Sequence, residues 1–216
     1  MTKAILLGSI GVLVDTSDMQ REAFNEAFRE GGLDWHWTPE DYAPLLKRSG
    51  GRARIERMAA ERGETVDAAA LHARKSEIFQ REMAKGIVPR PGIREVIAAA
   101  REAGVKLGFV TTTSDANVSV ALAAAEGVTA EDFDFLGHAG LVETGKPAPD
   151  IYHLALKTLG VSADEAIAVE DSAVSAQAAI DAGLRTIFFP GRYHADETVV
   201  DAHDRVERLT PALFGL

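Results

Sequence analysis

Short apolar runs alternate with longer amphipathic stretches along most of this chain. The apolar runs cover residues 3–7, 106–111, 166–169 and 185–189, and each lies beside a stretch with helical periodicity. Apolar runs of this length, flanked by helical patterns, indicate parallel strands that are joined by crossover helices. The pattern therefore predicts an α/β core in which helices flank a Rossmann-like parallel sheet.

Glycines mark the ends of the helices that are expected around this sheet. The helical patterns span residues 93–103, 115–126, 149–159 and 172–182, and they are followed by Gly104, Gly127, Gly160 and Gly183 respectively. Glycine readily adopts the left-handed backbone conformation that commonly ends a helix. We therefore expect each of these helices to stop before its glycine.

Residues 16–87 show a different pattern. This stretch is charged and amphipathic, with helical periodicity over residues 20–30, 39–48, 52–62 and 66–85 and without a convincing strand pattern. Two prolines, Pro89 and Pro91, mark the return to the core. We therefore predict a small inserted all-helical cap domain of residues 16–87, packed over the carboxyl edge of the sheet, and a core domain of residues 1–15 plus 88–216.

Composition narrows the class of protein. The chain has 216 residues, of which 46% are hydrophobic, and a formal net charge of −10, which disfavours nonspecific binding to nucleic acid or to an anionic membrane. It has no cysteine, which excludes disulfides and thiolate metal sites and favours a reducing compartment. No stretch approaches the roughly 18 apolar residues of a membrane span, and the first residues lack the pattern of a secretion signal. We expect a cytoplasmic protein without nucleic-acid or membrane partners.

Hydroxyl side chains follow the second predicted strand. The strand is expected to end and a helix to begin at four hydroxyl residues, Thr111, Thr112, Thr113 and Ser114. The free backbone N–H groups at the start of a helix favour the binding of an anion. The simpler interpretation is that Thr113 or Ser114 caps the helix. Both interpretations stay open at this stage.

A lysine stands between rigid neighbours before the next helix. Lys146 is followed by Pro147 and Pro149, which stiffen the backbone, so that its charge can be held against a phosphate oxygen. The alternative is an ordinary surface lysine near the start of a helix.

Two adjacent acids, Glu170 and Asp171, stand at the end of the third core strand. Their oxygens suit a hard cation such as Mg²⁺, whereas the alternative is that Asp171 or Ser172 caps the following helix. The two roles are compatible, because one acid can cap while the other reaches a metal.

In this order, the segments resemble the haloacid dehalogenase superfamily of aspartate-nucleophile phosphatases and phosphomutases, over essentially the whole chain. That family carries a strand-end aspartate nucleophile, a serine or threonine, a lysine and an acidic pair, and the matching positions here are Gly8, Thr111, Lys146 and Glu170 with Asp171. The resemblance implies phosphate binding by Thr111, Thr112 and Lys146, and a Mg²⁺ site at Glu170 and Asp171.

Finer motifs resemble the branch of CbbY and β-phosphoglucomutase-like proteins, which process small sugar phosphates. These motifs lie at residues 90–92, 111–118 and 146–152. Residues 47–55 are similar to the substrate-facing cap loop of that branch. In this loop Gly50 and Gly51 would permit a tight turn, and Lys47 or Arg54 would meet a second phosphate. Without the resemblance, these charges are typical of a solvated helix face.

The first loop departs from the family pattern. Aligned with the family, the nucleophile position is Gly8 and the acid/base position is Ile10. Glycine cannot accept a phosphoryl group and isoleucine cannot transfer a proton. Loss of a nucleophile in other covalent mechanisms costs on the order of a millionfold in turnover. Because the family's metal site also uses the nucleophile carboxylate, we expect Mg²⁺ binding to be weak or absent.

Two neighbours are candidates to substitute for the missing acids. Ser9 is the nearest nucleophile, but strand alternation predicts that its side chain points away from the site. Asp15 is expected to cap the following helix or to line the hinge of the cap.

Three functions therefore compete. The leading hypothesis is a relative of sugar-phosphate hydrolases that is catalytically impaired at Gly8 and Ile10 and still binds a phosphorylated small metabolite. The second is an active Mg²⁺-dependent phosphatase or phosphomutase, acting on a small phosphorylated sugar with a reorganised first loop. The third is a module that binds a protein partner and keeps an empty site.

Overall fold

The structure is a computed structural model that describes residues 1–46 and 50–216. These residues form two compact units. One unit combines Met1–Asp15 with Gly86–Leu216 and contains the sheet, and the other, Thr16–Lys85, is helical.

A parallel sheet organises the first unit. Among the described residues six strands pair in the order β3-β2-β1-β4-β5-β6, and every pair is parallel. The strands are β1 (Ala4–Leu7), β2 (Lys106–Val110), β3 (Phe135–Gly137), β4 (Ala166–Glu170), β5 (Arg185–Phe188) and β6 (Asp204–Arg205). The four strands predicted from apolar runs are confirmed. The edge strands β3 and β6 were missed, because three and two residues are too few to show a hydrophobic period.

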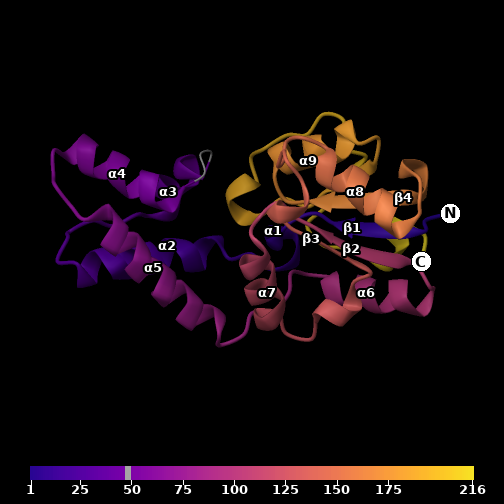
Figure 1. Ribbon diagram of the computed structural model, residues 1–216, viewed down its shortest axis with the longest axis horizontal. Helices are drawn as coiled ribbons and strands as arrows, with labels where there is room; N and C mark the ends of the chain where they lie inside the picture. Colours follow the sequence, from indigo (N-terminus) through magenta and orange to yellow (C-terminus); the bar gives the residue numbers. More distant parts are fainter. Residues whose placement is uncertain (47–49) are drawn as a thin grey trace. The chain divides into compact units, whose positions relative to one another are not determined.

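Alternation along the strands supplies a core to each face of the sheet. In β1, Ile5 and Leu7 pack into one hydrophobic cluster, while Ala4 and Leu6 pack into another. Helices α6 (Ile93–Glu102) and α7 (Asp115–Ala124) cover the first face, and α8 (Asp150–Leu159) and α9 (Ala173–Asp181) cover the second (Figure 1). This arrangement confirms the predicted α/β core with a Rossmann-like sheet between helices.

The ends of these helices follow local chemistry. Helix α8 ends at Gly160, whose φ of 66° is left-handed, as expected. Helix α7 stops earlier than predicted, at Ala124, because Ala125 forms a parallel bridge with Ile87. The shorter elements of this unit are α1 (Ile10–Leu13) and the 3-10 turns Ala130–Asp132, Ala139–Leu141, Ala163–Glu165, Arg192–His194 and Pro211–Phe214.

The strand order determines where a site can form. From β1 the chain first runs to β2 and β3 on one side, and it then returns to β4, β5 and β6 on the other. The carboxyl ends of β2, β1 and β4 therefore meet at the point where the strand order reverses, which is where parallel sheets bind ligands.

The second unit is a helical cap. Its helices are α2 (Ser17–Glu30), α3 (Pro39–Leu45), α4 (Gly51–Arg62) and α5 (Ala68–Met83), which confirms an inserted all-helical cap. Its core is aromatic: the rings of Phe24 and Phe28 lie 5.0 Å and 4.9 Å from the ring of Trp37, and buried Trp35 and Tyr42 pack beside them. Such edge-to-face contacts stabilise the cap beyond simple burial.

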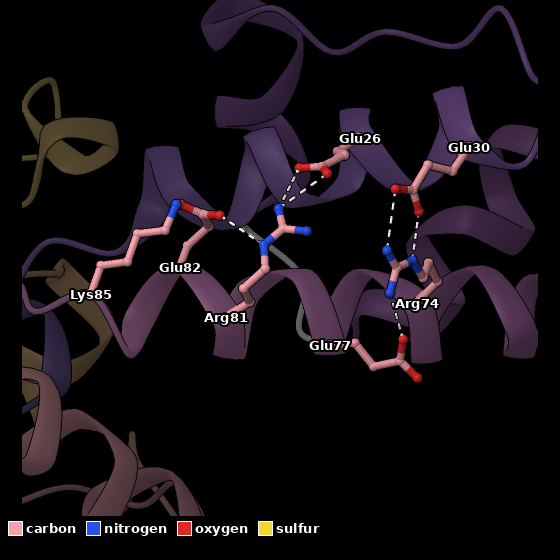
Figure 2. A network of polar contacts seen from close by, with 7 residues as sticks. All are labelled: Glu26, Glu30, Arg74, Glu77, Arg81, Glu82 and Lys85. Atoms are coloured by element: carbon pink, nitrogen blue, oxygen red, sulfur yellow. Dashed lines mark hydrogen bonds and ion pairs between the residues drawn. The ribbon is translucent and has the colours of Figure 1, made fainter.

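An exposed network of ion pairs joins α2 to α5 (Figure 2). Arg74 of α5 contacts Glu30 of α2, and Arg81 of α5 contacts Glu26 of α2 at 3.1 Å. Within α5, Glu77 and Glu82 add further contacts to the two arginines. Because these side chains are partly exposed to solvent, we expect the network to add little stability.

No helix in the described ranges is both long and apolar enough to cross a membrane.

Candidate functional site

The predicted site residues of the core meet at the carboxyl edge of the sheet. Gly8 follows β1, Thr111 follows β2, and Glu170 is the last residue of β4. Lys146 reaches the same place from the loop before α8, since its Nζ contacts both Gly8 and Glu170. The structure adds Tyr152, from the first turn of α8, to this group.

Lys146 is held entirely by protein groups. Its Nζ donates to the carbonyl oxygens of Gly8 and Val110, the latter at 2.7 Å, and to Oε1 of Glu170. The hydroxyl of Tyr152 lies 3.3 Å away. An ammonium group has three N–H donors, and these three acceptors match them. The side chain is 5% exposed, so Lys146 is a buried and satisfied cation.

Glu170 is the buried anion that faces this lysine. Its side chain is 0% exposed, and Oε1 accepts from both Lys146 Nζ and the hydroxyl of Tyr152. Oε2 has no hydrogen-bond partner among the described residues. Burial raises the pKa of Glu170, and the charge of Lys146 opposes that shift. Burial and then the nearby carboxylate raise the pKa of Tyr152, which keeps its hydroxyl protonated as a donor.

The space beside Gly8 is already filled. A Cβ atom added to Gly8 would lie under 3.0 Å from Cδ of Glu170 and from the hydroxyl oxygen of Tyr152. Both approaches are far below van der Waals contact, so no other residue fits here unless Glu170 and Tyr152 move. The space that a side chain at position 8 would need is thus taken by the carboxyl group of Glu170 and the hydroxyl group of Tyr152.

Asp171 turns to the first loop. Its Oδ1 accepts from Oγ of Ser9 at 2.8 Å, and Ser9 also caps α1 by accepting from the N–H of Val12. Ser9 thus contacts Asp171, whereas a side chain at position 8 would meet Glu170 and Tyr152, which agrees with the expectation that Ser9 points away from the position of residue 8. Ser172, rather than Asp171, caps α9.

Asp15 has a different partner from the one expected. Its Oδ2 accepts from the backbone N–H of Arg192 at 2.9 Å, while Thr16 occupies the N-cap position of α2. Asp15 therefore does not occupy the N-cap position of α2, and the other expected role, lining the hinge of the cap, stays a prediction. Its carboxylate instead ties the end of the first loop to the segment after β5.

The hydroxyl segment serves the start of α7. Ser114 caps this helix by accepting from the N–H of Asn117, and Thr113 accepts from the side-chain amide of Asn117 at 2.9 Å. Thr111 is buried and accepts from the N–H of Thr113 at 3.2 Å. Thr112 lies against Gly145, next to Lys146. Capping by Ser114 is confirmed, and a role of Thr111 and Thr112 toward phosphate stays a prediction.

Arg90, the first residue of the motif at residues 90–92, has a structural role. Its guanidinium donates to the carbonyls of Gly11 and Phe189, both at 2.9 Å, and to that of Pro190 at 2.6 Å. It also lies 3.5 Å above the ring of Phe189. Arg90 therefore fixes the first loop to the end of β5. The motif at residues 90–92 signalled this position but not its contacts.

The cap residues singled out from the sequence lie at the start of α4. Gly50 has a left-handed φ of 98°, and a Cβ atom on Gly51 would meet His72 at 2.5 Å. Arg54 is buried, donates to the carbonyl of Leu45 at 3.2 Å and packs over aromatic rings of the cap. Lys47 lies outside the described residues. A role for Lys47 or Arg54 toward a second phosphate stays a prediction.

Lys75 is a second buried cation of the cap, and no sequence motif singled it out. Its Nζ lies 4.9 Å and 4.8 Å from the ring centres of Phe24 and Phe79 and 3.1 Å from Oε1 of Gln20. Burial lowers the pKa of Lys75 to about 8.

The residues present do not fit a Mg²⁺ ion in this arrangement. Magnesium requires an octahedron of oxygen ligands, usually including carboxylates. Across the part of the chain that the structure describes, no group of three or more His, Cys, Asp or Glu side chains can hold a metal. Glu170 Oε1 and the Gly8 carbonyl are both engaged by Lys146. The two acids therefore serve protein contacts here.

Comparisons with known proteins identify the family and the fold of this chain. Residues 2–183 match the model of the haloacid dehalogenase-like hydrolases. Protein CbbY of Cereibacter sphaeroides is 42% identical over 221 residues, covering 100% of this chain and 96% of the relative, and CbbY of Rhodobacter capsulatus is 35% identical over 97% of this chain and 95% of the relative. Crystal structures of CbbY from Rhodobacter sphaeroides, with phosphate and, for a variant, with xylulose-1,5-bisphosphate, superpose with a TM-score of 0.79 at 40% identity and cover 96% of this chain and 95% of theirs.

Proposed function

This chain belongs to the haloacid dehalogenase-like hydrolases, in their CbbY branch, and on that basis we propose that it has lost phosphoryl transfer and retains a binding site for a phosphorylated small molecule. The proposal concerns the sheet edge formed by Gly8, Thr111, Thr112, Lys146 and Glu170.

The filled space beside Gly8 carries the proposal. A nucleophile must present an oxygen to the phosphorus atom, and position 8 has neither a side chain nor room for one beside Glu170 and Tyr152. Ile10, at the acid/base position, packs against the hydrophobic core. The chain's own residues therefore supply no carboxylate at either position.

The proposed ligand class follows from the relative. CbbY from Rhodobacter sphaeroides binds phosphate, and a variant of it binds xylulose-1,5-bisphosphate. We propose that this chain takes a sugar phosphate of similar size. Its phosphate would be received by Thr111, Thr112 and the N-terminus of α7, a ten-residue helix whose end favours an anion. Lys146 would add a positive charge.

A second function is favoured by one observation, the 42% identity to CbbY over the full length of this chain. An active Mg²⁺-dependent phosphatase or phosphomutase with a rearranged first loop would keep such similarity. This alternative requires Glu170 to leave Lys146 and an unidentified group to accept the phosphoryl group.

Turnover and binding measured side by side decide between these functions. Xylulose-1,5-bisphosphate and a panel of sugar phosphates are incubated with Mg²⁺, and released phosphate is compared with that of a Lys146→Ala control. We expect no turnover above the control, together with calorimetric binding of xylulose-1,5-bisphosphate that Thr112→Val weakens. Mg²⁺-dependent turnover well above the control would overturn the proposal. If the chain shows neither turnover nor binding of the sugar phosphate, both functions are wrong, and the third hypothesis, a module that binds a protein partner, remains.

A further inference from the structure

We propose that Glu170 is the built-in anion of this site: its carboxylate stands where position 8 would carry a side chain, neutralises Lys146, and competes with phosphate for that lysine. The inference rests on the proposed function and adds a mechanism of ligand competition to it.

The charge balance of the buried cluster is the first argument. Lys146 and Glu170 are 5% and 0% exposed, so neither charge is stabilised by water. Among the residues that the structure describes, Glu170 is the one anionic group in contact with Lys146 Nζ. Buried charges require a partner, and with glycine at position 8 that partner has to come from elsewhere. Glu170 fills this requirement.

The geometry of position 8 is the second argument. A Cβ atom on Gly8 would overlap Oε1 of Glu170, the same oxygen that accepts from Lys146 and Tyr152. The Glu170 carboxylate therefore occupies part of the volume that an aspartate at position 8 would fill. Tyr152 is a positioning residue for this carboxylate, because its protonated hydroxyl can donate only toward the acceptor that faces it.

The donors of Lys146 are the third argument. Its three N–H groups point to the carbonyls of Gly8 and Val110 and to Glu170. A phosphate oxygen gains a donor from Lys146 only when one of these acceptors withdraws. The two carbonyls belong to strand ends that are anchored in the sheet, whereas Glu170 contacts the lysine through a side chain with rotatable bonds. Two anions beside one ammonium repel, so phosphate and Glu170 exclude each other.

Removing the charge of Glu170 tests the competition. Inorganic phosphate is titrated into the parent chain and into Glu170→Gln with a chelator present, and affinity and the phosphate-dependent rise in Tm are recorded. The glutamine amide keeps an acceptor for Lys146 but leaves the cation without an anion. Phosphate should therefore bind this variant at least about tenfold more tightly and raise its Tm more than that of the parent.

Glu165→Gln is the matched control. It makes the same chemical change at the other end of β4, where Glu165 pairs with the exposed Lys3. Its phosphate affinity should equal that of the parent. An equal gain in both variants would reflect net charge alone, and unchanged or weaker binding in Glu170→Gln would overturn the competition.

A carboxylate swap covers the case in which Glu170→Gln fails to fold. Gly8→Asp inserts a side chain into filled space, and Glu170→Ala removes the anion of Lys146, so each alone should lower Tm. The double variant Gly8→Asp/Glu170→Ala moves the carboxylate from one side of the same volume to the other. We expect the double variant to lose clearly less stability than the sum of the losses in the two single variants. Additive losses would show that the two groups do not share a place.

The two outcomes separate this inference from the proposed function. If neither the parent nor any variant binds phosphate, the proposed ligand-binding function is wrong. The stability of the double variant Gly8→Asp/Glu170→Ala still shows whether the two side chains occupy the same volume. If parent and Glu170→Gln bind phosphate equally, the ligand function stands and the competition is wrong.

Discussion

Strand β4 is bounded by two lysine–glutamate pairs of the same chemistry in opposite settings. Glu165 precedes the strand and pairs with Lys3, with side chains 29% and 60% exposed. Glu170 ends it and pairs with Lys146, with side chains 0% and 5% exposed. Water solvates and screens the first pair, so the ion pair itself adds little stability. In the second pair each charge depends on the other, because both side chains are buried away from solvent.

From this comparison we expect that burial, rather than pairing, decides how much each charge contributes to the stability of the fold. The network of the cap in Figure 2 belongs with the exposed pair, although it contains more contacts. The candidate site holds the buried pair. Substitutions of this pair are therefore expected to change stability as well as the proposed ligand binding, and the two have to be measured together.

The largest difference is expected between two identical substitutions. Lys146→Met removes the cation that faces buried Glu170 and should lower the free energy of unfolding by about 3–5 kcal/mol at pH 7. Lys3→Met removes the partner of exposed Glu165 and should leave it nearly unchanged. Urea denaturation of both variants checks this. Similar losses would refute the contrast between the two ends of β4.

Lys75 sharpens the comparison, because it is a buried cation whose described contacts are aromatic rings and an amide oxygen rather than a carboxylate. Its pKa is about 8 in the folded cap and 10.5 in the unfolded chain, so between these pH values the unfolded state binds more protons. The Lys75 contribution to stability is therefore lowest below pH 8 and rises with pH. The total rise is about 3 kcal/mol, at about 1.36 kcal/mol per pH unit.

Tryptophan fluorescence measures this effect in the cap alone, because both tryptophans of the chain, Trp35 and Trp37, lie in that unit. Unfolding is followed in urea at several pH values from about 7 to about 10 for the parent and for Lys75→Met, a range that spans most of the interval between the two pKa values. The free energy of unfolding of the parent should increase relative to that of Lys75→Met as the pH rises. A difference independent of pH would contradict the lowered pKa.

A smaller effect is expected from Tyr152→Phe. It removes the hydroxyl that donates to Glu170 and should cost about 2 kcal/mol, as is typical of a hydrogen bond to a charged group. The same substitution in the Glu170→Ala background should cost much less, because its acceptor is already gone. Equal costs in the two backgrounds would show that the hydroxyl acts through other contacts.

The smallest effect is expected in the cap network. Arg81→Met breaks the contacts of Arg81 with Glu26 and Glu82 on a side chain that is largely solvated. We expect no resolvable change in Tm, either at low or at high salt. A loss comparable to that of Tyr152→Phe would remove the distinction between exposed and buried pairs.

Much of the fold was predictable from the spacing of hydrophobic residues along the chain. The central strands β1, β2, β4 and β5 are fully or mostly buried runs, and their length and apolar content separate them from the helices. Strands β3 and β6 were not predictable, because their pairing depends on neighbours far along the chain. The early end of α7 has the same cause, since Ala125 bridges to Ile87.

The candidate site was predictable as a set of positions but not as a set of contacts. Parallel strands present their carboxyl ends at one edge, so Gly8, Thr111 and Glu170 were expected there together. Tyr152 lies within the motif at residues 146–152, but only the structure shows that its hydroxyl, carried by α8, donates to Glu170. The contacts of Arg90 and Lys75 were not predictable, because their partners are backbone carbonyls and aromatic rings.

By itself, the sequence determined the α/β core, the helical cap, the family and the absence of a carboxylate at Gly8 and Ile10. These depend on local period, on spacing and on the identity of single residues. Only the tertiary structure decided what lies beside Gly8: Glu170, far along the chain, lies in the space that a side chain at position 8 would need and pairs with Lys146. The physical reason is that a buried cation requires an anion, and only the folded chain determines which carboxylate is near enough to serve.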